Sequence, residues 1–289
     1  FIKLNGKESL YSRDYKSGDT IFNKMYAKTL RKIMNEGQDG FYKGEVAEDM
    51  IKTIKKNGGI MTMEDLNQYH SVWRDPVRFE YKDYDIISMS FPSSGGILLG
   101  QMLKAIEQFD LSNIKHNSAE YIQLLTEIER RAFADRSDLM GDPDFMNLPV
   151  YEFMDKDYIQ ERMSNFSWDI ATPSSVVKPG ELVFNESDET THFSIIDDKG
   201  NAVSVTTTLN NSFGSKVFVE ESGFFLNNEM DDFSSKPGFP NFFGVIGSEA
   251  NSIKPNKRML SAMTPTIVLS NEKPFLILGS PGGPSIITS

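Results

Sequence analysis

The chain has 289 residues, of which 39% are hydrophobic, and it carries a formal net charge of −11. This length supports a substantial core, whereas the negative charge argues against nucleic acid or an anionic membrane surface as a partner. The absence of cysteine excludes disulfides, a thiolate nucleophile and cysteine-based metal sites. No apolar run approaches the roughly 20 residues of a transmembrane helix. These limits are compatible with an enzyme that handles small molecules.

The first half of the chain is predicted to be rich in helices. Apolar residues recur at helical spacing between capping residues and glycine stops. Helices are expected over residues 21–36 with Thr20 as the cap, and over 45–57, 97–109 and 118–138. Thr62 with Asp65 predicts a further short, capped turn of helix. Two strands are expected between these helices, at residues 77–81 and 84–89.

A polar segment, residues 171–189, separates the two halves. It contains Pro173 and Pro179 and is longer than most connections inside a compact domain. Such length is typical of a functional or cleavable segment. After it, polar and apolar residues alternate as in β-strands. Strands are expected over residues 191–196, 202–209, 224–227, 265–270 and 274–279. Helices followed by strands predict an α+β domain.

Two threonines, Thr190 and Thr191, stand where the polar segment meets the first of these strands. A threonine hydroxyl is a poor nucleophile unless a base lies beside it, and a cut just before the threonine turns its own α-amine into that base. This amine titrates near pH ~7.7–8.0. A threonine at a loop-to-strand junction is therefore a candidate N-terminal nucleophile. A threonine pair at a strand start also simply suits β geometry.

The three histidines, His70, His116 and His192, give little support for other chemistry. None belongs to a helical i, i+4 pair of histidines, so a zinc site is not expected. No Gly-x-Ser-x-Gly elbow supports a serine triad. We expect His192 to pack or hydrogen-bond on its strand.

Two later segments could bind charged groups. Residues 227–234, Asn-Asn-Glu-Met-Asp-Asp-Phe-Ser, could form a capped turn or place carboxylates around an ammonium group. They lack the ligand spacing of a calcium EF-hand. Gly282 and Gly283 follow the last strand, where their N–H groups could form an oxyanion hole or an ordinary turn. Residues 92–96, Pro-Ser-Ser-Gly-Gly, allow the same two interpretations.

Taken in order, these segments closely resemble the γ-glutamyltransferase (γ-glutamyltranspeptidase) family. The motifs that carry the resemblance are Thr190-Thr191-His192, Thr208-Leu209-Asn210, residues 228–234, Pro255-Asn256-Lys257-Arg258 and Gly279-Ser280-Pro281-Gly282-Gly283. Residues 39–44, 92–96, 134–137 and 141–143 in the first half also agree with the family. The resemblance covers essentially the whole chain.

The resemblance implies an N-terminal-nucleophile hydrolase with an α+β fold, a four-layer αββα sandwich expected to be incomplete at both ends of this chain. Residues 1–189 would be the C-terminal part of a large subunit and residues 190–289 the N-terminal part of a small subunit. Both parts would lie in one αββα domain. The precursor would cut itself between Glu189 and Thr190.

The reaction implied by the resemblance is cleavage of the γ-glutamyl amide bond of glutathione and related compounds. Thr190 would form a γ-glutamyl ester, which water or an amino acid or peptide acceptor resolves. The large and small subunits of the same precursor would be each other's partners. No metal or organic cofactor is implied, and a periplasmic or secreted location is expected from the family alone.

The resemblance also assigns catalytic roles. Thr208 matches the threonine that hydrogen-bonds the nucleophile, and Thr191 matches the residue that supports the orientation of the nucleophile. Gly282 and Gly283 match the oxyanion-hole glycines.

The resemblance also implies contacts to the substrate. Asn210, Glu229 and Asp232 match residues that hold the glutamyl α-amine, and Ser261 matches one that holds the carboxylate. Ala262 stands where the family usually has a second serine, so one carboxylate contact is expected to be lost.

Phe243 stands where many bacterial members have a lid tyrosine. Phenylalanine can cover a site but cannot hydrogen-bond to Asn210. The family's carboxylate-binding arginine would precede Phe1, and no residue here matches it. Two alternatives stay open: a related enzyme that acts on poly-γ-glutamate or β-lactam side chains, and a truncated or unprocessed domain without activity.

Overall fold

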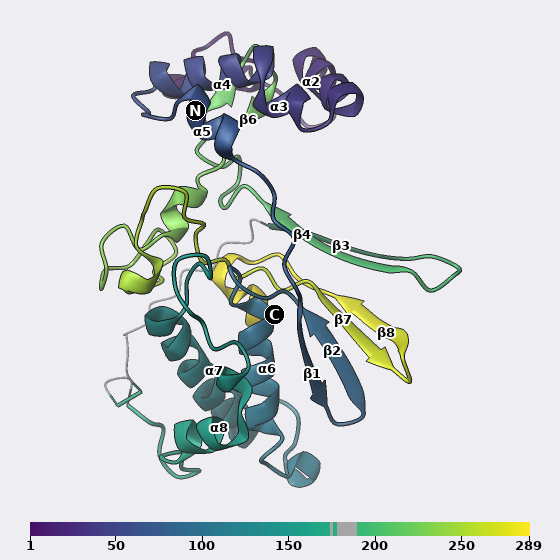
Figure 1. Ribbon diagram of the computed structural model, residues 1–289, viewed down its shortest axis with the longest axis vertical. Coiled ribbons are helices and arrows are strands. Elements are labelled where there is room, and N and C mark those ends of the chain that lie inside the picture. The colour runs from purple at the N-terminus through teal and green to yellow at the C-terminus, as the bar shows by residue number, and fades with distance from the viewer. Residues whose placement is uncertain (174–175, 178–189) are drawn as a thin grey trace. The chain divides into compact units, whose positions relative to one another are not determined.

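The computed structural model describes residues 1–173, 176–177 and 190–289, and the chain divides into two compact units (Figure 1). The first unit comprises Phe1–Trp73 and Leu209–Asn228, and the second comprises Arg74–Thr208 and Glu229–Ser289. Most of the predicted polar segment, including Glu189, lies outside the described residues.

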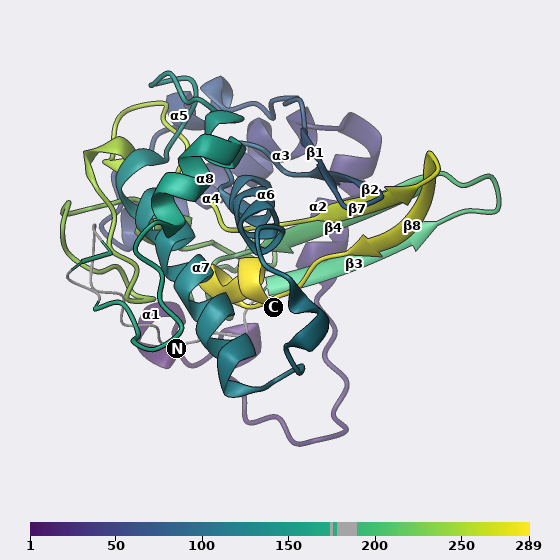
Figure 2. The same cartoon turned by 90° about the horizontal axis from the view of Figure 1, so that it is seen from below.

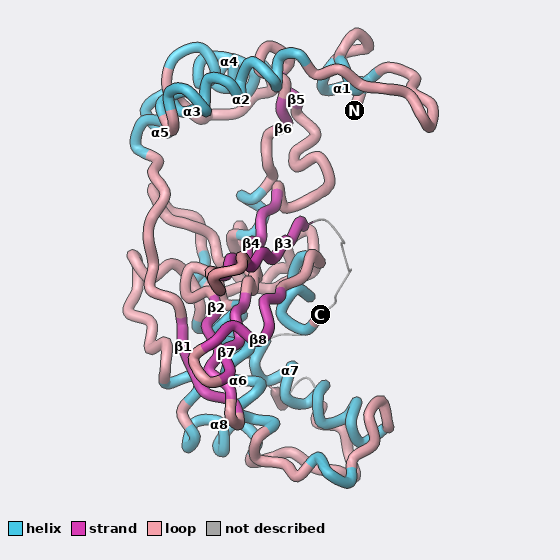
Figure 3. The backbone as a smooth tube through the Cα atoms, turned by 90° about the vertical axis from the view of Figure 1, so that its right-hand side faces the viewer, coloured by secondary structure: helices cyan, strands magenta, loops and turns pink. Residues whose placement is uncertain are grey.

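The first unit is mostly helical, as the cyan segments around α2 and α4 show (Figure 3). Its helices are α1 (Ile2–Asn5), α2 (Lys24–Glu36), α3 (Asp39–Tyr42), α4 (Gly44–Lys56) and α5 (Met63–Gln68). Two short antiparallel strands, β5 (Phe218–Val219) and β6 (Phe224–Phe225), complete it. A small core forms where Met50 and Ile51 of α4 pack with Leu66 of α5.

Two predictions for the first unit need correction. The first helix begins at Lys24 and not at residue 21, because the side chain of Asn23 caps it by accepting a 2.9 Å hydrogen bond from the Tyr26 N–H. The strand predicted over residues 224–227 ends at Phe225, because its partner β5 is only two residues long. The capping box of Thr62 and Asp65 is confirmed at the start of α5.

The second unit contains a four-stranded antiparallel sheet in the order β1-β2-β7-β8. Its strands are β1 (Val77–Tyr81), β2 (Tyr84–Ser88), β7 (Thr266–Ser270) and β8 (Lys273–Leu278). Ile86 of β2 stands opposite Val268 of β7, so the sheet joins segments that are far apart in the chain. Alternating burial along β1 places Val77 and Phe79 in the core, as period-2 patterning requires.

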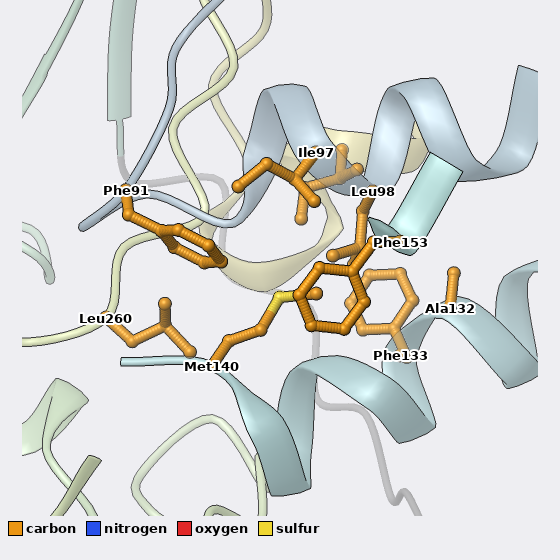
Figure 4. Packing of buried hydrophobic residues seen from close by; sticks show 9 residues of the cluster. Phe91, Ile97, Leu98, Ala132, Phe133, Met140, Phe153 and Leu260 are labelled. Atoms are coloured by element: carbon orange, nitrogen blue, oxygen red, sulfur yellow. The ribbon is translucent and has the colours of Figure 1, made fainter. Parts of the chain in front are cut away.

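Helix α6 (Gly95–Ile106) packs against this sheet, and α7 (Ala119–Leu139) and α8 (Lys156–Met163) pack against α6. In Figure 4 the side chains of Phe91, Leu98, Met140 and Leu260 meet in one apolar cluster. The sequence did not predict α8, because only two of its eight residues are buried hydrophobics and its apolar period is weak.

A separate hairpin of β3 (Thr190–Ile196) and β4 (Ala202–Thr208) runs beside β8 (Figure 2). The Ser204 hydroxyl donates a 3.0 Å hydrogen bond to the Leu278 carbonyl. Further along, Gly279 lies so close to His192 that a Cβ on the glycine would stand 2.3 Å from the ring. A mixed fold of helices and sheets is thus confirmed.

Candidate functional site

Thr190 is the first residue of β3, and it stands directly opposite Thr208 of β4. The neighbouring pair in the same ladder is Thr191 with Thr207. The structure therefore brings together the candidate nucleophile and the threonine predicted to hydrogen-bond it. Alternation along the strand points Thr190 and Thr191 to opposite faces, so their side chains meet different surroundings.

His192 makes structural contacts on its own hairpin, as predicted. Its Nδ1 lies 2.8 Å from the Thr206 hydroxyl and its Nε2 lies 3.1 Å from the Ser194 hydroxyl. Burial lowers the pKa of the His192 ring. These contacts occupy both ring nitrogens and explain why this histidine need not act as a base.

The chain that leaves β8 approaches the start of β3. Leu278 contacts Ser204, whose partner in the ladder is Ser194, and Gly279 lies against His192. The first residue after β8 therefore lies against β3, two residues along the chain from Thr190. The placement of Gly282 and Gly283 beside the nucleophile stays a prediction.

Gly282 and Gly283 adopt backbone conformations that glycine favours. Their φ angles are 136° and 53°, a region that side-chain-bearing residues rarely occupy. Gly283 begins the 3₁₀ helix η6 (Gly283–Thr288). The first N–H groups of a helix have no acceptor within it. In this geometry the two glycine N–H groups can donate hydrogen bonds to an anion.

Glu229 and Asp232 lie on the 3₁₀ turn η4 (Glu229–Asp232), and their side chains hydrogen-bond to each other. Burial, followed by the charge of Asp232 and this hydrogen bond, raises the pKa of Glu229 to about 8. Burial also raises the pKa of Asp232 to about 6; the charge of Arg136 opposes this rise and that of Asp231 adds to it. Two carboxyls in this state share a proton near neutral pH and favour a cationic ligand.

Ser261 is fixed by its backbone. Its N–H donates to the Pro92 carbonyl at 2.9 Å, and its carbonyl accepts from the Ser94 N–H at 3.0 Å and the Ser94 hydroxyl at 2.9 Å. The preceding Leu260 sits in the apolar cluster of Figure 4. Ala262 packs against the same cluster with a methyl group in place of a hydroxyl.

Two residues near these groups carried no predicted role. The side-chain amide of Asn251 donates to the Asp232 carbonyl at 2.7 Å, and its oxygen accepts from the Leu260 N–H at 3.0 Å. The Arg136 Nε donates to the Ser94 hydroxyl at 2.9 Å. We call Glu229, Asp232, Ser261, Asn251, Ser94 and Arg136 the Asp232–Ser261 cluster.

Asn210 belongs to the first unit. It is 6% exposed, has a φ of 75°, and donates from its side-chain amide to the Asn228 carbonyl at 3.1 Å. Phe243 is 2% exposed and lies in a turn that the side chain of Asn241 closes by accepting from the Phe243 N–H. The predicted roles of Asn210 in amine binding and of Phe243 as a lid stay predictions.

Within residues 1–173, 176–177 and 190–289, no group of three or more His, Cys, Asp or Glu residues is arranged to hold a metal ion. In the same residues, no helix combines the length and apolar character that crossing a membrane requires.

Residues 9–289 match the family model of gamma-glutamyltranspeptidase. The chain belongs to this family. It is 46% identical over 274 residues to the glutathione hydrolase proenzyme of Escherichia coli strain K12, a match that covers 95% of this chain and 47% of that protein. This chain therefore spans about half the length of that relative.

Solved structures agree with this assignment. The gamma-glutamyltranspeptidase of Helicobacter pylori matches with 46% identity and a TM-score of 0.55, over 58% of this chain and 48% of that one. A cephalosporin acylase from Bacillus halodurans matches with a TM-score of 0.75 over 94% of this chain and 47% of that one. Its 22% identity supports a shared fold only.

Proposed function

We propose that the full-length protein is a γ-glutamyltransferase and glutathione hydrolase that cuts itself between Glu189 and Thr190. The observation that carries this proposal, within a chain of this family, is the placement of Thr190. It opens β3 directly after the peptide expected to be cut, and it pairs with Thr208. A threonine freed at this point has its α-amine beside its own hydroxyl.

Self-cleavage is an exchange of an amide for an ester. The Thr190 Oγ attacks the carbonyl of Glu189, the peptide C–N bond breaks, and the hydroxyl proton passes to the Thr190 nitrogen. Water then opens the ester, which leaves a Glu189 carboxylate and restores the Thr190 hydroxyl. The new α-amine, with a pKa near ~7.7–8.0, is suited to accept a proton near neutral pH.

The same hydroxyl attacks the γ-carbonyl of the donor during turnover, and the α-amine takes its proton. The N–H groups of Gly282 and Gly283 stabilise the oxyanion that forms. The proton then passes to the departing amine, and a γ-glutamyl ester remains on Thr190. Water or an amino acid acceptor resolves the ester and regenerates the free hydroxyl.

The Asp232–Ser261 cluster supplies the specificity for a γ-glutamyl group. Glu229 and Asp232 together attract the α-ammonium group of the donor, because two buried carboxyls gain from a cation more than one does. Ser261 binds the α-carboxylate. Because Ala262 has no hydroxyl, the carboxylate has one contact fewer than in family members with a second serine. An amide donor without an α-amine would not bring the ammonium group that this acidic pair can bind.

We also propose that the described sheet, hairpin and helices are part of a four-layer αββα sandwich. Helix α6 packs beside β1 and β2, and the β3–β4 hairpin runs beside β8, which supports an order of helix, sheet and second sheet. The chain spans about half of its relatives, which leaves length for further layers. A periplasmic or secreted location is proposed from the family alone.

A denaturing gel tests the nucleophile. The full-length protein is expected to split into two bands, and Thr190→Ala to remain one band with activity reduced at least ~10³-fold. Thr207→Ala is the matched control, because this exposed threonine lies in the same hairpin and has no proposed role, so the split should persist. Splitting of Thr190→Ala at residue 189 would show that the assignment of Thr190 is wrong.

Release of the leaving group from a γ-glutamyl anilide, with and without glycylglycine, tests the reaction and the acceptor. The acylase alternative predicts the opposite preference, for a β-lactam side chain over this donor. The acidic pair favours the γ-glutamyl donor, because the α-ammonium group is the feature that the pair can bind. A self-cleaved protein that ignores the anilide would support the alternative.

A further inference from the structure

Arg136 is a buried cation that the proposed reaction does not use. It lies near the end of α7 and is 7% exposed. Burial lowers the pKa of its guanidinium to about 10, against the opposing influence of Asp232, so the group stays charged at neutral pH. A buried charge persists only where its surroundings compensate for the loss of water. The compensation comes from residues of the Asp232–Ser261 cluster.

One link runs from Arg136 to Ser261. Ser94 is fully buried, and its hydroxyl accepts from the Arg136 Nε and donates to the Ser261 carbonyl, both at 2.9 Å. Accepting one hydrogen bond directs the hydroxyl proton into the other, so the two bonds reinforce each other. Arg136 thereby fixes the backbone from which the Ser261 side chain projects.

A second link runs from Arg136 to Asp232. Within the described residues no ion pair includes Arg136, yet its charge is the cation that lowers the pKa of Asp232. It therefore acts through space, and the carboxylate oxygens are not committed to a salt bridge. Asn251 holds the Asp232 backbone and Leu260 in fixed relation, and Ser248 anchors that loop by donating to the Ser137 carbonyl at 3.0 Å.

We propose that Arg136 is a positioning residue for donor binding. It keeps the negative charge of the acidic pair on Asp232 and, through Ser94, sets the position of Ser261. One buried guanidinium thus supports the residues proposed for both charged ends of the donor's glutamyl group. This inference rests on the proposed function.

The charges around Glu229 and Asp232 determine the direction in which the pH dependence of donor binding shifts when Arg136 is replaced. The groups that act on Asp232 are Glu229 and Asp231 of η4 and Arg136 of α7. Burial and Asp231 favour the protonated carboxyl, and the cation Arg136 favours the ionised form. Removal of its charge shifts the protonation of Asp232 to higher pH. A protonated pair binds an ammonium group weakly, so donor binding should then require a higher pH.

The test measures kcat and KM for a γ-glutamyl anilide against pH, in the self-cleaved full-length protein and its variants. Arg136→Met is expected to raise KM about tenfold at pH 7 and to move the acid limb of kcat/KM upward by about one pH unit. The kcat at saturation should change much less, because Thr190 and its amine are untouched. Arg136→Lys keeps the charge, so its acid limb should return toward that of the wild type.

Two further variants separate the links and control for folding. Ser94→Ala removes the hydroxyl but leaves the charge of Arg136, so KM should rise while the acid limb stays in place. Arg131→Lys changes another buried arginine of α7, which contacts Glu127 and no residue of the cluster. It should lower thermal stability without moving the acid limb.

An Arg136→Met protein that folds and cleaves itself, with the wild-type KM and acid limb, would overturn the inference. If that variant does not fold, unchanged KM values in both Arg136→Lys and Ser94→Ala would overturn it as well. A wild-type protein that neither uses the anilide nor binds L-glutamate in a calorimeter would instead contradict the proposed function, and this inference with it.

Discussion

Helix α7 carries two buried arginines, Arg131 and Arg136, whose surroundings differ. Near the middle of the helix, the Arg131 guanidinium binds the Glu127 carboxylate at 2.5 Å and the Asn165 side chain at 2.5 Å. Near its end, Arg136 lies close to Asp232 without forming an ion pair with it in the described structure. Both arginines are buried, so the difference lies in whether a carboxylate pairs directly with the guanidinium.

The pKa shifts of the carboxyl groups record this difference. Burial alone would raise the pKa of Glu127, but hydrogen bonds from Arg131 and Thr172 outweigh burial and lower it. At Glu229 and Asp232 burial prevails, and both pKa values are raised. Glu127 therefore forms an ion pair with Arg131 that stabilises the fold. In the acidic pair the charge of Arg136 does not outweigh burial, and an ammonium ligand would add positive charge there.

The largest effect on stability is expected where the ion pair is complete. Arg131→Met leaves the Glu127 carboxylate buried without its cation and should cost about 3–5 kcal/mol of unfolding free energy. Denaturant unfolding of the full-length protein measures this loss. The KM for the donor should be unchanged in the protein that remains folded. A raised KM with normal stability would show that Arg131 contributes to donor binding and not to the stability of the fold.

A substitution in the acidic pair should instead raise the free energy of unfolding at alkaline pH. The folded pKa of Glu229 is raised above its unfolded value near 4.5, so wild-type stability falls as pH rises from about 5 to about 8. Glu229→Gln cannot ionise and avoids this loss. It should become more stable than the wild type at pH 8, by up to about 4 kcal/mol, with little difference at pH 5.

Thermal unfolding at the two pH values checks this, and donor KM should rise in the same variant. A stability difference that does not change with pH would mean that Glu229 titrates normally. Glu229→Ala is the weaker comparison, because it also removes the hydrogen bond with Asp232. Glutamine keeps a group that can form this bond, so it isolates the charge.

Much of this arrangement could be predicted from local sequence. The alternation that opens at Thr190 gave β3 and β4 within one residue, and Thr62 with Asp65 gave the cap of α5. Short-range rules succeed here because strand alternation and capping depend on a few neighbouring residues.

Long-range contacts could not be predicted in this way. The acidic and basic residues of α7 resemble a solvated helix face in the sequence, whereas Glu127 and Arg131 are 1% and 3% exposed. Their partners, Asn165 and Thr172, come from segments more than 30 residues away. The role of Arg136 likewise depends on Ser94 and Asp232, and no periodicity in the sequence connects those residues to it. For the same reason, the resemblance identified Asp232 and Ser261 but not the residues that hold them in place.

The smallest effect is expected at an exposed ion pair of the first unit. Glu45 accepts hydrogen bonds from Lys28 at 2.6 Å and from Lys32 at 2.5 Å, and these two contacts lower its pKa to about 2. The lowered pKa means that any stability it adds is present above the unfolded pKa and is lost as pH falls toward 2. Glu45 is half exposed, so water and salt screen the interaction.

Glu45→Gln should therefore leave the unfolding midpoint at pH 7 within experimental error, and added salt should not change that result. Arg131→Met provides the reference measured in the same way. A loss from Glu45→Gln as large as that from Arg131→Met would mean that burial does not decide the energetic weight of these charges. The contrast between the two groups on α7 depends on that premise, since Glu127 differs from Glu45 in exposure more than in the direction of its pKa shift.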